Sequence, residues 1–332
     1  MYRDIHSSLS PRTLRLLDGY QRDFPLVSRP FLQLANDSPD DWNEAELIGQ
    51  LQQARRLGVL SRLGCIFAPN TVGSSTLAAL AVPPERLESV ASFVSSHVEV
   101  NHNYLRAHHF NLWFVVAAET AAEVAQVLSR IYLATGLKPL NLPLLREYHV
   151  DLGFSFLPDG DQSRSKSPPP PSLMLNWRER RLVSALSAGL SLMERPYQQL
   201  AEACGWQEED VLQRLAHWQK QGVIRRLGFV VSHRELGYKA NAMCVWQIDD
   251  PAQREAVALR LAEEAAVSLC YERPARLPEW PYHLFCMIHA KTEDQLQQLL
   301  DDISQRHQLE HLPSAVLPSL RRYTQRGARY GR

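Results

Sequence analysis

The chain has 332 residues, 45% of them hydrophobic, which is enough to build about two to four domains. Its 36 basic and 36 acidic residues give a formal net charge of zero, which argues against a protein whose main partner is a polyanion. The five cysteines are scattered without a Cys-x-x-Cys pair, which favours reduced thiols in the cytoplasm over a disulfide framework or a metal site. We expect no membrane span, because no stretch reaches the roughly 18 apolar residues of a span. We also expect no signal peptide, because residues 1–21 carry charges and no long apolar core.

Residues 1–72 have the pattern of a winged helix-turn-helix. Three helices are expected at 14–20, 30–35 and 43–57, and a strand at 59–67, in a looser form of the pattern in the second half. Residues 173–236 repeat this pattern, with helices at 179–190, 196–204 and 208–221 and a strand, the arm of a hairpin, at 223–231. Pro196 and Gly205 stand at the start and just past the end of a helix, as terminal preferences predict.

Each helical segment is followed by strands and helices in the order βαββαβ. In residues 73–157 we expect strands at 75–82, 98–106, 110–118 and 138–147, with helices at 84–97 and 121–135. In residues 237–332 the strands are expected at 240–248, 267–273, 283–290 and 315–320, with helices at 252–264 and 292–305. This order predicts two ferredoxin-like domains and an α+β fold class.

The two halves are copies of one unit. Residues 29–35, 58–64 and 142–148 are echoed, in the same order, by residues 195–201, 222–228 and 317–323. Similar segments in one order indicate a duplication. Between the halves, residues 158–172 are rich in proline and serine and predict an extended, exposed linker.

The helices that would read DNA begin with acidic residues. These are Glu208, Glu209 and Asp210 in the second half, and Asp40, Asp41, Glu44 and Glu46 in the first. Carboxylates at a helix start are ordinary capping residues, but they also repel the phosphate backbone. Both copies being acidic argues against DNA as a partner, although the Arg55-Arg56 and Arg225-Arg226 pairs leave phosphate contacts open.

A row of polar residues recurs in both halves. His102, Tyr104 and Arg106 are two residues apart and are expected on one face of a strand. Tyr271 and Arg273 repeat the last two, whereas Leu269 replaces the histidine. Histidine exchanges protons near neutral pH and arginine binds carboxylates, so the row predicts a ligand site. A structural histidine and surface arginines in salt bridges are the alternatives.

Longer motifs match known families. A winged helix-turn-helix followed by this sheet domain resembles Lrp/AsnC regulators. Residues 102–106, 110–114 and 146–154 resemble the NirD-type subunit of siroheme decarboxylase. Residues 233–241, 243–246, 270–274, 280–289 and 326–330 resemble the NirL-type subunit. The chain is thus similar to a siroheme decarboxylase with both subunits fused, and a tetrapyrrole-responsive regulator is the alternative.

The resemblance implies removal of carbon dioxide from two acetate groups of siroheme, giving didecarboxysiroheme for haem d1. No cofactor is implied beyond the iron of siroheme, and no protein metal site. The two sheet domains are expected to pair face to face within the chain. A homodimer of whole chains and assistance from NirG- or NirH-type subunits are left open, as is a tetrapyrrole carrier without catalysis.

Residue roles follow from this substrate, a flat iron macrocycle that carries carboxylates. His102 is the expected proton donor, with Tyr104 orienting it or the substrate. The expected cations are Arg106, Arg273, Arg225, Arg226 and Lys239, and the expected walls are Trp113, Trp246, Trp280 and Phe285. His283 could supply a proton in the second half, where Tyr271 and Arg273 bind, or it is a structural histidine. His233 and His289 are open as iron ligands or bystanders.

Overall fold

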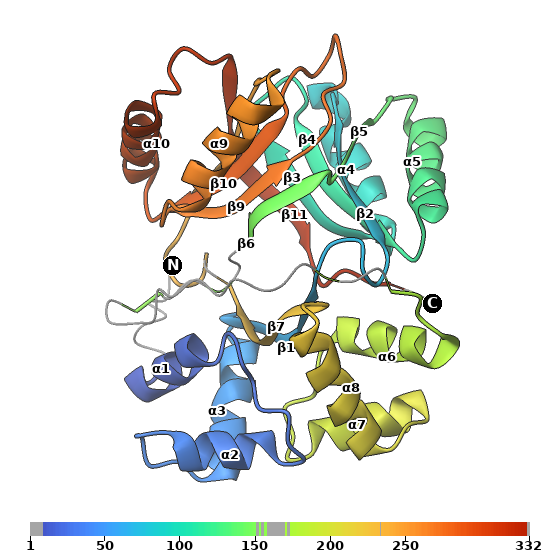
Figure 1. Ribbon diagram of the computed structural model, residues 1–332, viewed down its shortest axis with the longest axis vertical. Coiled ribbons are helices and arrows are strands. Elements are labelled where there is room, and N and C mark those ends of the chain that lie inside the picture. The colour runs from blue at the N-terminus through green and yellow to red at the C-terminus, as the bar shows by residue number, and fades with distance from the viewer. Residues whose placement is uncertain are drawn as a thin grey trace. The chain divides into compact units, whose positions relative to one another are not determined.

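The computed structural model describes residues 9–150, 153, 156–157, 170, 173–232 and 234–330, and the chain divides into two compact units (Figure 1). The first, here called the winged-helix unit, spans Met1–Val72, Gly153–Gly237 and Tyr330–Arg332. The second, the sheet unit, spans Gly73–Leu152 and Tyr238–Arg329. Each unit therefore contains segments of both halves of the sequence. The expected linker, residues 158–172, lies almost wholly outside the described residues.

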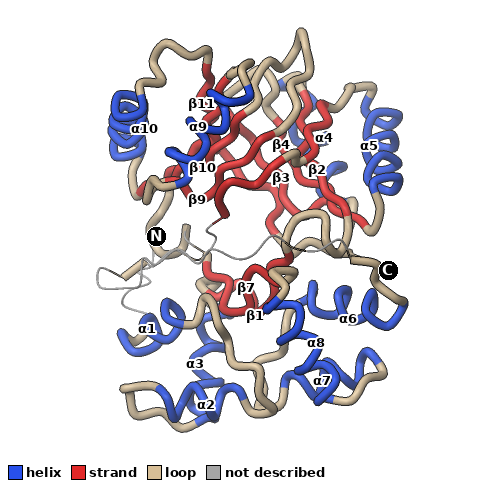
Figure 2. The backbone as a smooth tube through the Cα atoms, viewed as in Figure 1, coloured by secondary structure: helices blue, strands red, loops and turns tan. Residues whose placement is uncertain are grey.

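Two three-helix motifs form the winged-helix unit (Figure 2). The first comprises α1 (Pro11–Gly19), α2 (Pro30–Asp37), α3 (Glu44–Arg56) and β1 (Leu60–Phe67). The second comprises α6 (Trp177–Ala188), α7 (Pro196–Cys204), α8 (Glu208–Lys220) and β7 (Ile224–Val231). One hydrophobic core contains buried residues of both motifs, so the two motifs are packed as one body.

The wing strands pair with each other. β1 and β7 run antiparallel, with Gly64 opposite Gly228, so the expectation of a hairpin arm within residues 223–231 was wrong about its partner. Each motif offers a single strand, whose backbone groups need a partner, and the other motif supplies it. Gly228 is required here, because a Cβ at this position would lie 2.4 Å from the carbonyl oxygen of Gln21.

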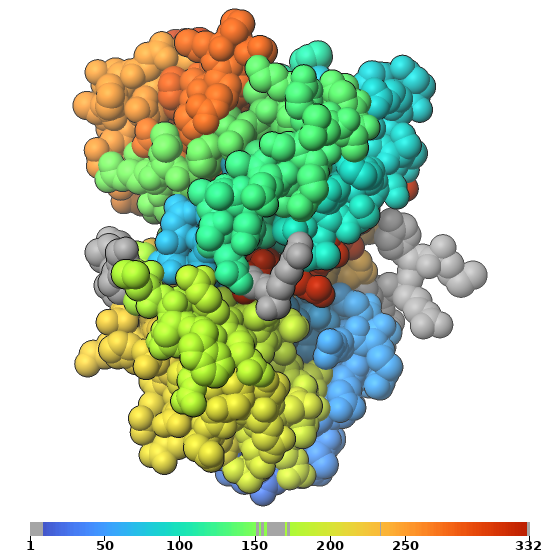
Figure 3. Space-filling view, turned by 90° about the vertical axis from the view of Figure 1, so that its right-hand side faces the viewer, coloured from blue at the N-terminus to red at the C-terminus, as the bar shows by residue number. Residues whose placement is uncertain are grey.

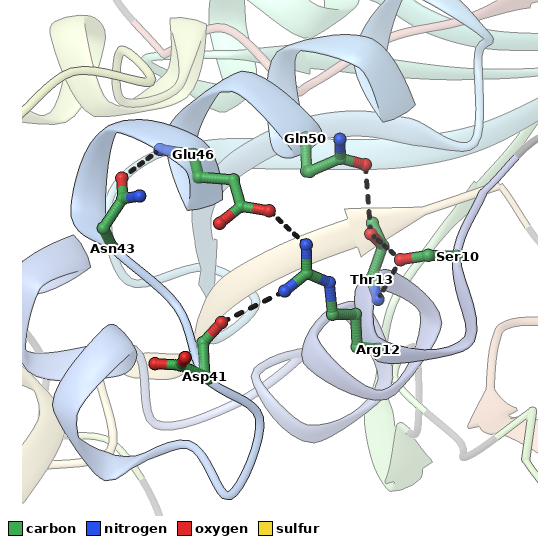
Figure 4. A network of polar contacts seen from close by, with 7 residues as sticks. All are labelled: Ser10, Arg12, Thr13, Asp41, Asn43, Glu46 and Gln50. Carbon is green, nitrogen blue, oxygen red and sulfur yellow. Dashed lines mark hydrogen bonds and ion pairs between the residues drawn. The ribbon is translucent and has the colours of Figure 1, made fainter.

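The acidic start of α3 is bound by the protein's own arginine (Figure 4). Asn43 caps the helix, its Oδ1 accepting from the backbone N–H of Glu46 at 2.8 Å. Arg12 of α1 forms an ion pair with Glu46 and donates to the carbonyl of Asp41 at 3.0 Å. The cap is therefore Asn43, and the acidic residues of this first turn, Glu44 and Glu46, form ion pairs with the protein's own arginines.

A belt of polar contacts joins the two helix-turn-helix motifs. Arg195 contacts Glu208 at 2.5 Å, and the Ser28 hydroxyl of the other motif donates to the same carboxylate at 3.0 Å. Arg29, the counterpart of Arg195, pairs with Glu44 and reaches Glu194 at 3.3 Å. Both reading helices thus begin at carboxylates that hold arginines of the protein.

The sheet unit contains, among the described residues, one sheet of nine strands in the order β5-β2-β4-β3-β11-β8-β10-β9-β6. The first half supplies β2 (Ser74–Leu80), the 3-10 turn η2 (Pro84–Arg86), α4 (Leu87–Ser96), β3 (Val100–Arg106), β4 (Leu112–Ala118), α5 (Ala121–Thr135), β5 (Leu140–Pro143) and β6 (Arg146–Val150). The second half supplies β8 (Ala240–Trp246), α9 (Pro251–Ala262), β9 (Val267–Glu272), β10 (Leu284–Ala290), α10 (Glu293–His307) and β11 (Ser314–Gln325).

The last strands are exchanged between the halves. The strand expected at 138–147 is divided: β5 pairs with β2 of its own half, and β6 pairs with β9 of the other. The strand expected at 315–320 is longer, and β11 pairs first with β8 and then with β3. Pro143 and Pro318 stand at these changes of partner, where a residue without an N–H interrupts a ladder.

The two faces of the sheet have different cores. Helices α4 and α5 cover the outer face of the first half's strands, and α9 and α10 cover that of the second, each over its own apolar cluster. Figure 3 shows the side that α5 covers. The inner faces share one core drawn from both halves: Ala79, Phe110, Trp113, Leu140, Leu142, Met243, Val245, Trp280, Phe285 and Leu317. Within the described residues, no helix has both the length and the apolar character to cross a membrane.

Candidate functional site

His102 and Tyr104 lie side by side on the inner face of β3. They stand opposite Val115 and Trp113 of β4, and directly opposed residues share a face of a sheet. Their rings are stacked, with centroids 6.2 Å apart and planes at 16°. His102 Nδ1 lies 3.0 Å from the Oδ1 of Asn101, and both rings are half-buried. The strand alternation that predicted one shared face is confirmed by this contact.

Strand β11 brings two further polar residues to the same place. Arg322 stands opposite Tyr104, and Gln325 stands opposite His102. Gln325 Oε1 accepts from the Tyr104 hydroxyl at 3.1 Å and from Arg322 Nη1 at 2.9 Å. Arg322 and Gln325 are exposed. We call these four residues the β3–β11 cluster, which contains two from each half of the chain.

Arg106 and Arg273 occupy equivalent, buried positions. Arg106 Nη1 donates to the carbonyl of Leu317 at 2.9 Å, and Arg273 Nη1 donates to the carbonyl of Leu142 at 2.6 Å. Burial lowers the pKa of each guanidinium to about 10. Both were expected to hold carboxylates of a ligand, but the structure places them in the interior, where each links its own half to a carbonyl of the other.

Each buried arginine also contacts the tyrosine two residues before it. The Arg106 guanidinium carbon lies 5.8 Å from the centre of the Tyr104 ring, and that of Arg273 lies 5.3 Å from the Tyr271 ring. These are cation–π distances. Each guanidinium group therefore packs against the ring of its tyrosine.

His289 on β10 lies close enough to Arg106 for their charges to interact. Its pKa falls to about 4, first because the ring is buried and second because the guanidinium of Arg106 disfavours a second positive charge. His289 stands opposite Asn241 of β8, whose Oδ1 accepts from the hydroxyl of Ser319 at 2.6 Å. The imidazole is therefore neutral at physiological pH.

The expected aromatic walls separate into two groups. Trp113, Trp280 and Phe285 all belong to the shared inner core. Trp113 and Trp280 meet edge to face at 5.0 Å, and both are fully buried. Trp246 instead belongs to the helix-covered outer core of the second half, so it does not lie on the face of the other three.

His283 also has outer-face neighbours. Burial lowers its pKa, as does Arg254, whereas Asp249 and Glu272 act in the opposite direction. Arg254 and Glu272 form an ion pair at 2.8 Å beside α9. Tyr271 lies on the inner face, opposite Phe285, so the structure does not bring His283 and Tyr271 together.

The remaining expected cations are divided between the units. Arg225 and Arg226 are on β7 of the winged-helix unit, where Arg226 Nη2 donates to the carbonyl of Phe229 at 2.9 Å. Lys239 is exposed and immediately precedes β8 of the sheet unit. Among the residues that the structure describes, no three His, Cys, Asp or Glu side chains are grouped to hold a metal ion. His233 lies outside the described residues.

Sequence reasoning missed Arg322 and Gln325. Both follow the strand expected at 315–320, and only the longer β11 brings them beside β3. Comparing the repeats would have indicated Arg322, because its counterpart in the first half is Glu147, a reversal of charge. His289 was named, but its approach to Arg106 required the pairing of the strands.

Family models match both units. An AsnC-like ligand binding domain matches residues 72–149 and again 235–324, which confirms the expected duplicated AsnC-type fold. A siroheme decarboxylase NirDL-like HTH domain matches residues 179–225. The second match agrees with the helix-turn-helix expected in the second half.

Whole-chain comparisons agree. The siroheme decarboxylase NirDL subunit of Paracoccus pantotrophus is 41% identical over 317 residues, which cover 95% of this chain and 96% of that protein. The siroheme decarboxylase of Hydrogenobacter thermophilus is 30% identical and covers 89% of this chain and 88% of its own length.

Solved structures give the same result. A crystal structure of the siroheme decarboxylase NirDL matches 96% of this chain and 94% of its own, with a TM-score of 0.71 and 29% identity. Another, in complex with an iron-uroporphyrin III analogue, matches 95% of this chain and 93% of its own, with a TM-score of 0.70 and 29% identity. The chain belongs to the NirDL siroheme decarboxylase family.

Proposed function

We propose that this chain is a carboxy-lyase that removes carbon dioxide, without oxidation, from two acetate side chains of siroheme. The product would be didecarboxysiroheme, on the way to haem d1. Family membership supports the reaction. The observation that supports its location is the β3–β11 cluster. In this cluster the His102 and Tyr104 rings are stacked, and Tyr104 and the exposed Arg322 both donate to the side chain of Gln325.

The reaction needs a proton but no electrons. When the bond to the carboxylate breaks, its electron pair stays on the methylene carbon, and carbon dioxide leaves. A proton then bonds to that carbon and makes a methyl group. Because no atom is oxidised or reduced by an outside reagent, we propose no cofactor besides the iron that siroheme carries.

His102 is the proposed proton donor. A positioned general acid contributes roughly 100- to 10,000-fold to a rate, and imidazole exchanges protons near neutral pH. Tyr104 orients the substrate beside it, and Gln325 fixes the direction of the tyrosine hydroxyl. Arg106 acts through Tyr104 as a positioning residue. Lys239, which is exposed, stays a candidate for a substrate carboxylate.

We propose a cytoplasmic enzyme whose two halves replace two subunits. The five cysteines are buried free thiols, which fits a reducing compartment. Relatives named siroheme decarboxylase NirD and NirL subunits, from Stutzerimonas stutzeri, are 44% and 47% identical and each match 45% of this chain. A relative from Paracoccus pantotrophus is named a NirH subunit, so NirG- or NirH-type proteins are candidate partners.

The test is to incubate the purified chain with siroheme under anaerobic conditions and to follow the product by mass. Loss of two carbon dioxide units per siroheme is the expected result. Siroheme that is bound but unchanged, in the absence of other proteins, would mean that the chain alone is not the enzyme.

Two matched variants locate the proton donor. His102→Asn should lower kcat by roughly 100-fold or more while siroheme still binds. Leu269→Asn, at the equivalent position of the second half, should leave kcat within about threefold of the original. Equal effects of both changes would remove His102 from its proposed role.

A further inference from the structure

The β3–β11 pair has a counterpart in the β9–β6 pair. Tyr104 faces Arg322 and His102 faces Gln325 in the first ladder. In the second, Tyr271 faces Glu147 and Leu269 faces Val150. Both ladders carry an irregularity at the same place, between Arg322 and Thr324 and between Glu147 and His149. The two sites are thus structural repeats, and they can be compared residue by residue.

Only the tyrosine is common to both sites. Where the first site has histidine, arginine and glutamine, the second has Leu269, Glu147 and Val150. A proton donor and an amide are replaced by apolar side chains, and a cation is replaced by an acidic residue. The cation–π contact of the tyrosine is present at both sites, from Arg106 to Tyr104 and from Arg273 to Tyr271. The backbone arrangement is therefore duplicated, whereas the histidine, arginine and glutamine beside the tyrosine are present at the first site alone of the two.

Arg322 is suited to bind a carboxylate from solvent. It is exposed, unlike Arg106 and Arg273, and its hydrogen bond to Gln325 uses Nη1. A guanidinium has five N–H groups and binds carboxylates in a bidentate manner. It lies opposite Tyr104, on the face that also carries His102. A carboxylate held by Arg322 would therefore lie beside the proposed proton donor.

Glu147 would have the opposite effect at the second site. Glu147 stands opposite Tyr271 in its ladder, the position that Arg322 has opposite Tyr104 in the first. The carboxylate of Glu147 would repel a carboxylate of the substrate, and this repulsion is stronger where water is partly excluded. A macrocycle ringed by carboxylates would therefore be favoured at the first site over the second.

We propose that the chain binds one polycarboxylate tetrapyrrole, at the β3–β11 cluster, and that Arg322 is its carboxylate-binding and specificity-determining cation. The proposal rests on the proposed function and deepens it. Both acetates then react at this one site. After the first carbon dioxide leaves, the macrocycle must turn or rebind so that the second acetate reaches His102.

The test is a titration of the whole chain with iron-uroporphyrin III, followed by its absorbance, which yields a stoichiometry and a Kd. One molecule per chain is expected. Arg322→Gln should raise Kd by about 10-fold or more, the usual effect of losing a charged hydrogen bond. Its matched control, Glu147→Gln, should keep Kd within about twofold. The stoichiometry should stay at one, because glutamine removes the repulsion but supplies no cation at the second site. Both residues occupy equivalent positions in the two ladders. Thermal melting of each variant checks that the fold is kept.

Three outcomes would overturn the proposal: two molecules bound per chain, an unchanged Kd in Arg322→Gln with the fold intact, or an equal loss in Glu147→Gln. These results are separate from the proposed function. A chain that decarboxylates siroheme but binds two molecules would refute the single site and leave the activity standing. A chain that binds one molecule through Arg322 and never releases carbon dioxide would refute the activity and leave the single site standing.

Discussion

Trp113 and Trp280 meet edge to face, with ring centroids 5.0 Å apart, and each comes from a different half of the chain. Both are fully buried in the inner core that the two half-sheets share. The Trp113 indole N–H donates to the carbonyl of Phe110 at 2.7 Å, which fixes its ring. Their contact is therefore part of what holds the two half-sheets face to face.

Removing one of these rings should destabilise the protein strongly. Trp280→Ala is expected to lower the free energy of unfolding by about 3–5 kcal/mol, because it leaves a cavity among buried neighbours. Trp177, which is 64% exposed, offers a matched control, and Trp177→Ala should change stability by less than about 0.5 kcal/mol. Urea unfolding followed by circular dichroism measures both. Similar midpoints for the two variants would contradict the packing role.

His289 should make stability depend on pH. Its pKa is about 4 in the folded protein against 6.5 for the free side chain, so between these values the unfolded chain binds more protons. Stability contributed by the neutral ring is therefore present above pH 6.5 and is lost as the pH falls toward 4, by up to about 3 kcal/mol.

The measurement compares unfolding midpoints across that pH range in two variants. His289→Asn should flatten the fall in stability between pH 6.5 and 4. His311→Asn, at an exposed position, should keep the slope of the original protein. An unchanged slope in His289→Asn would show that this ring is not the titrating group.

The belt between the helix-turn-helix motifs predicts a difference between two neighbouring glutamates. Glu208 accepts from Arg195 and from the Ser28 hydroxyl of the other motif, whereas Glu209 is exposed at the same helix start. Glu208→Ala should cost about 1 kcal/mol, the sum of a surface ion pair and a hydrogen bond. Glu209→Ala should cost less than about 0.5 kcal/mol, and because both remove charge from one helix turn, the dipole effect cancels. Equal losses in thermal melting would contradict the belt.

DNA binding should be absent. The reading helices begin at Glu44 and Glu208, whose carboxylates hold Arg29 and Arg195, and the net charge of the chain is zero. With carboxylates at the starts of both helices, phosphate neutralisation supplies little affinity there. We expect no retarded band with duplex DNA at about 50 mM salt. A band that weakens steeply as salt rises would revive the regulator interpretation.

Local features of the fold could be predicted from the sequence. The helix expected at 121–135 is α5, and that at 196–204 is α7, with Gly205 in the left-handed conformation at φ 72°. The bounds of a helix follow from its apolar periodicity and its terminal residues, because a helix makes its backbone hydrogen bonds within one segment of the chain. Strands were also found near their expected places.

The partners of the strands could not be predicted in the same way. Strands β6 and β11 pair across the halves, and both copies share one alternating pattern, so the sequence does not distinguish its own sheet from its neighbour's. The candidate site shows the same limit. His102 and Tyr104 on one face followed from alternation, whereas Arg322 and Gln325 depend on the register of β11 against β3.

The exchange of the last strands makes the two halves mutually dependent. The first half expressed alone would expose the edge of β3, and the second would expose the edge of β9, and unpaired edges promote aggregation. Two halves on separate chains would have to meet by diffusion, at whatever concentrations the cell supplies. A single polypeptide replaces that encounter with an intramolecular one, at an effective concentration in the millimolar range. Fusion therefore guarantees one-to-one assembly even when few copies of the protein are made.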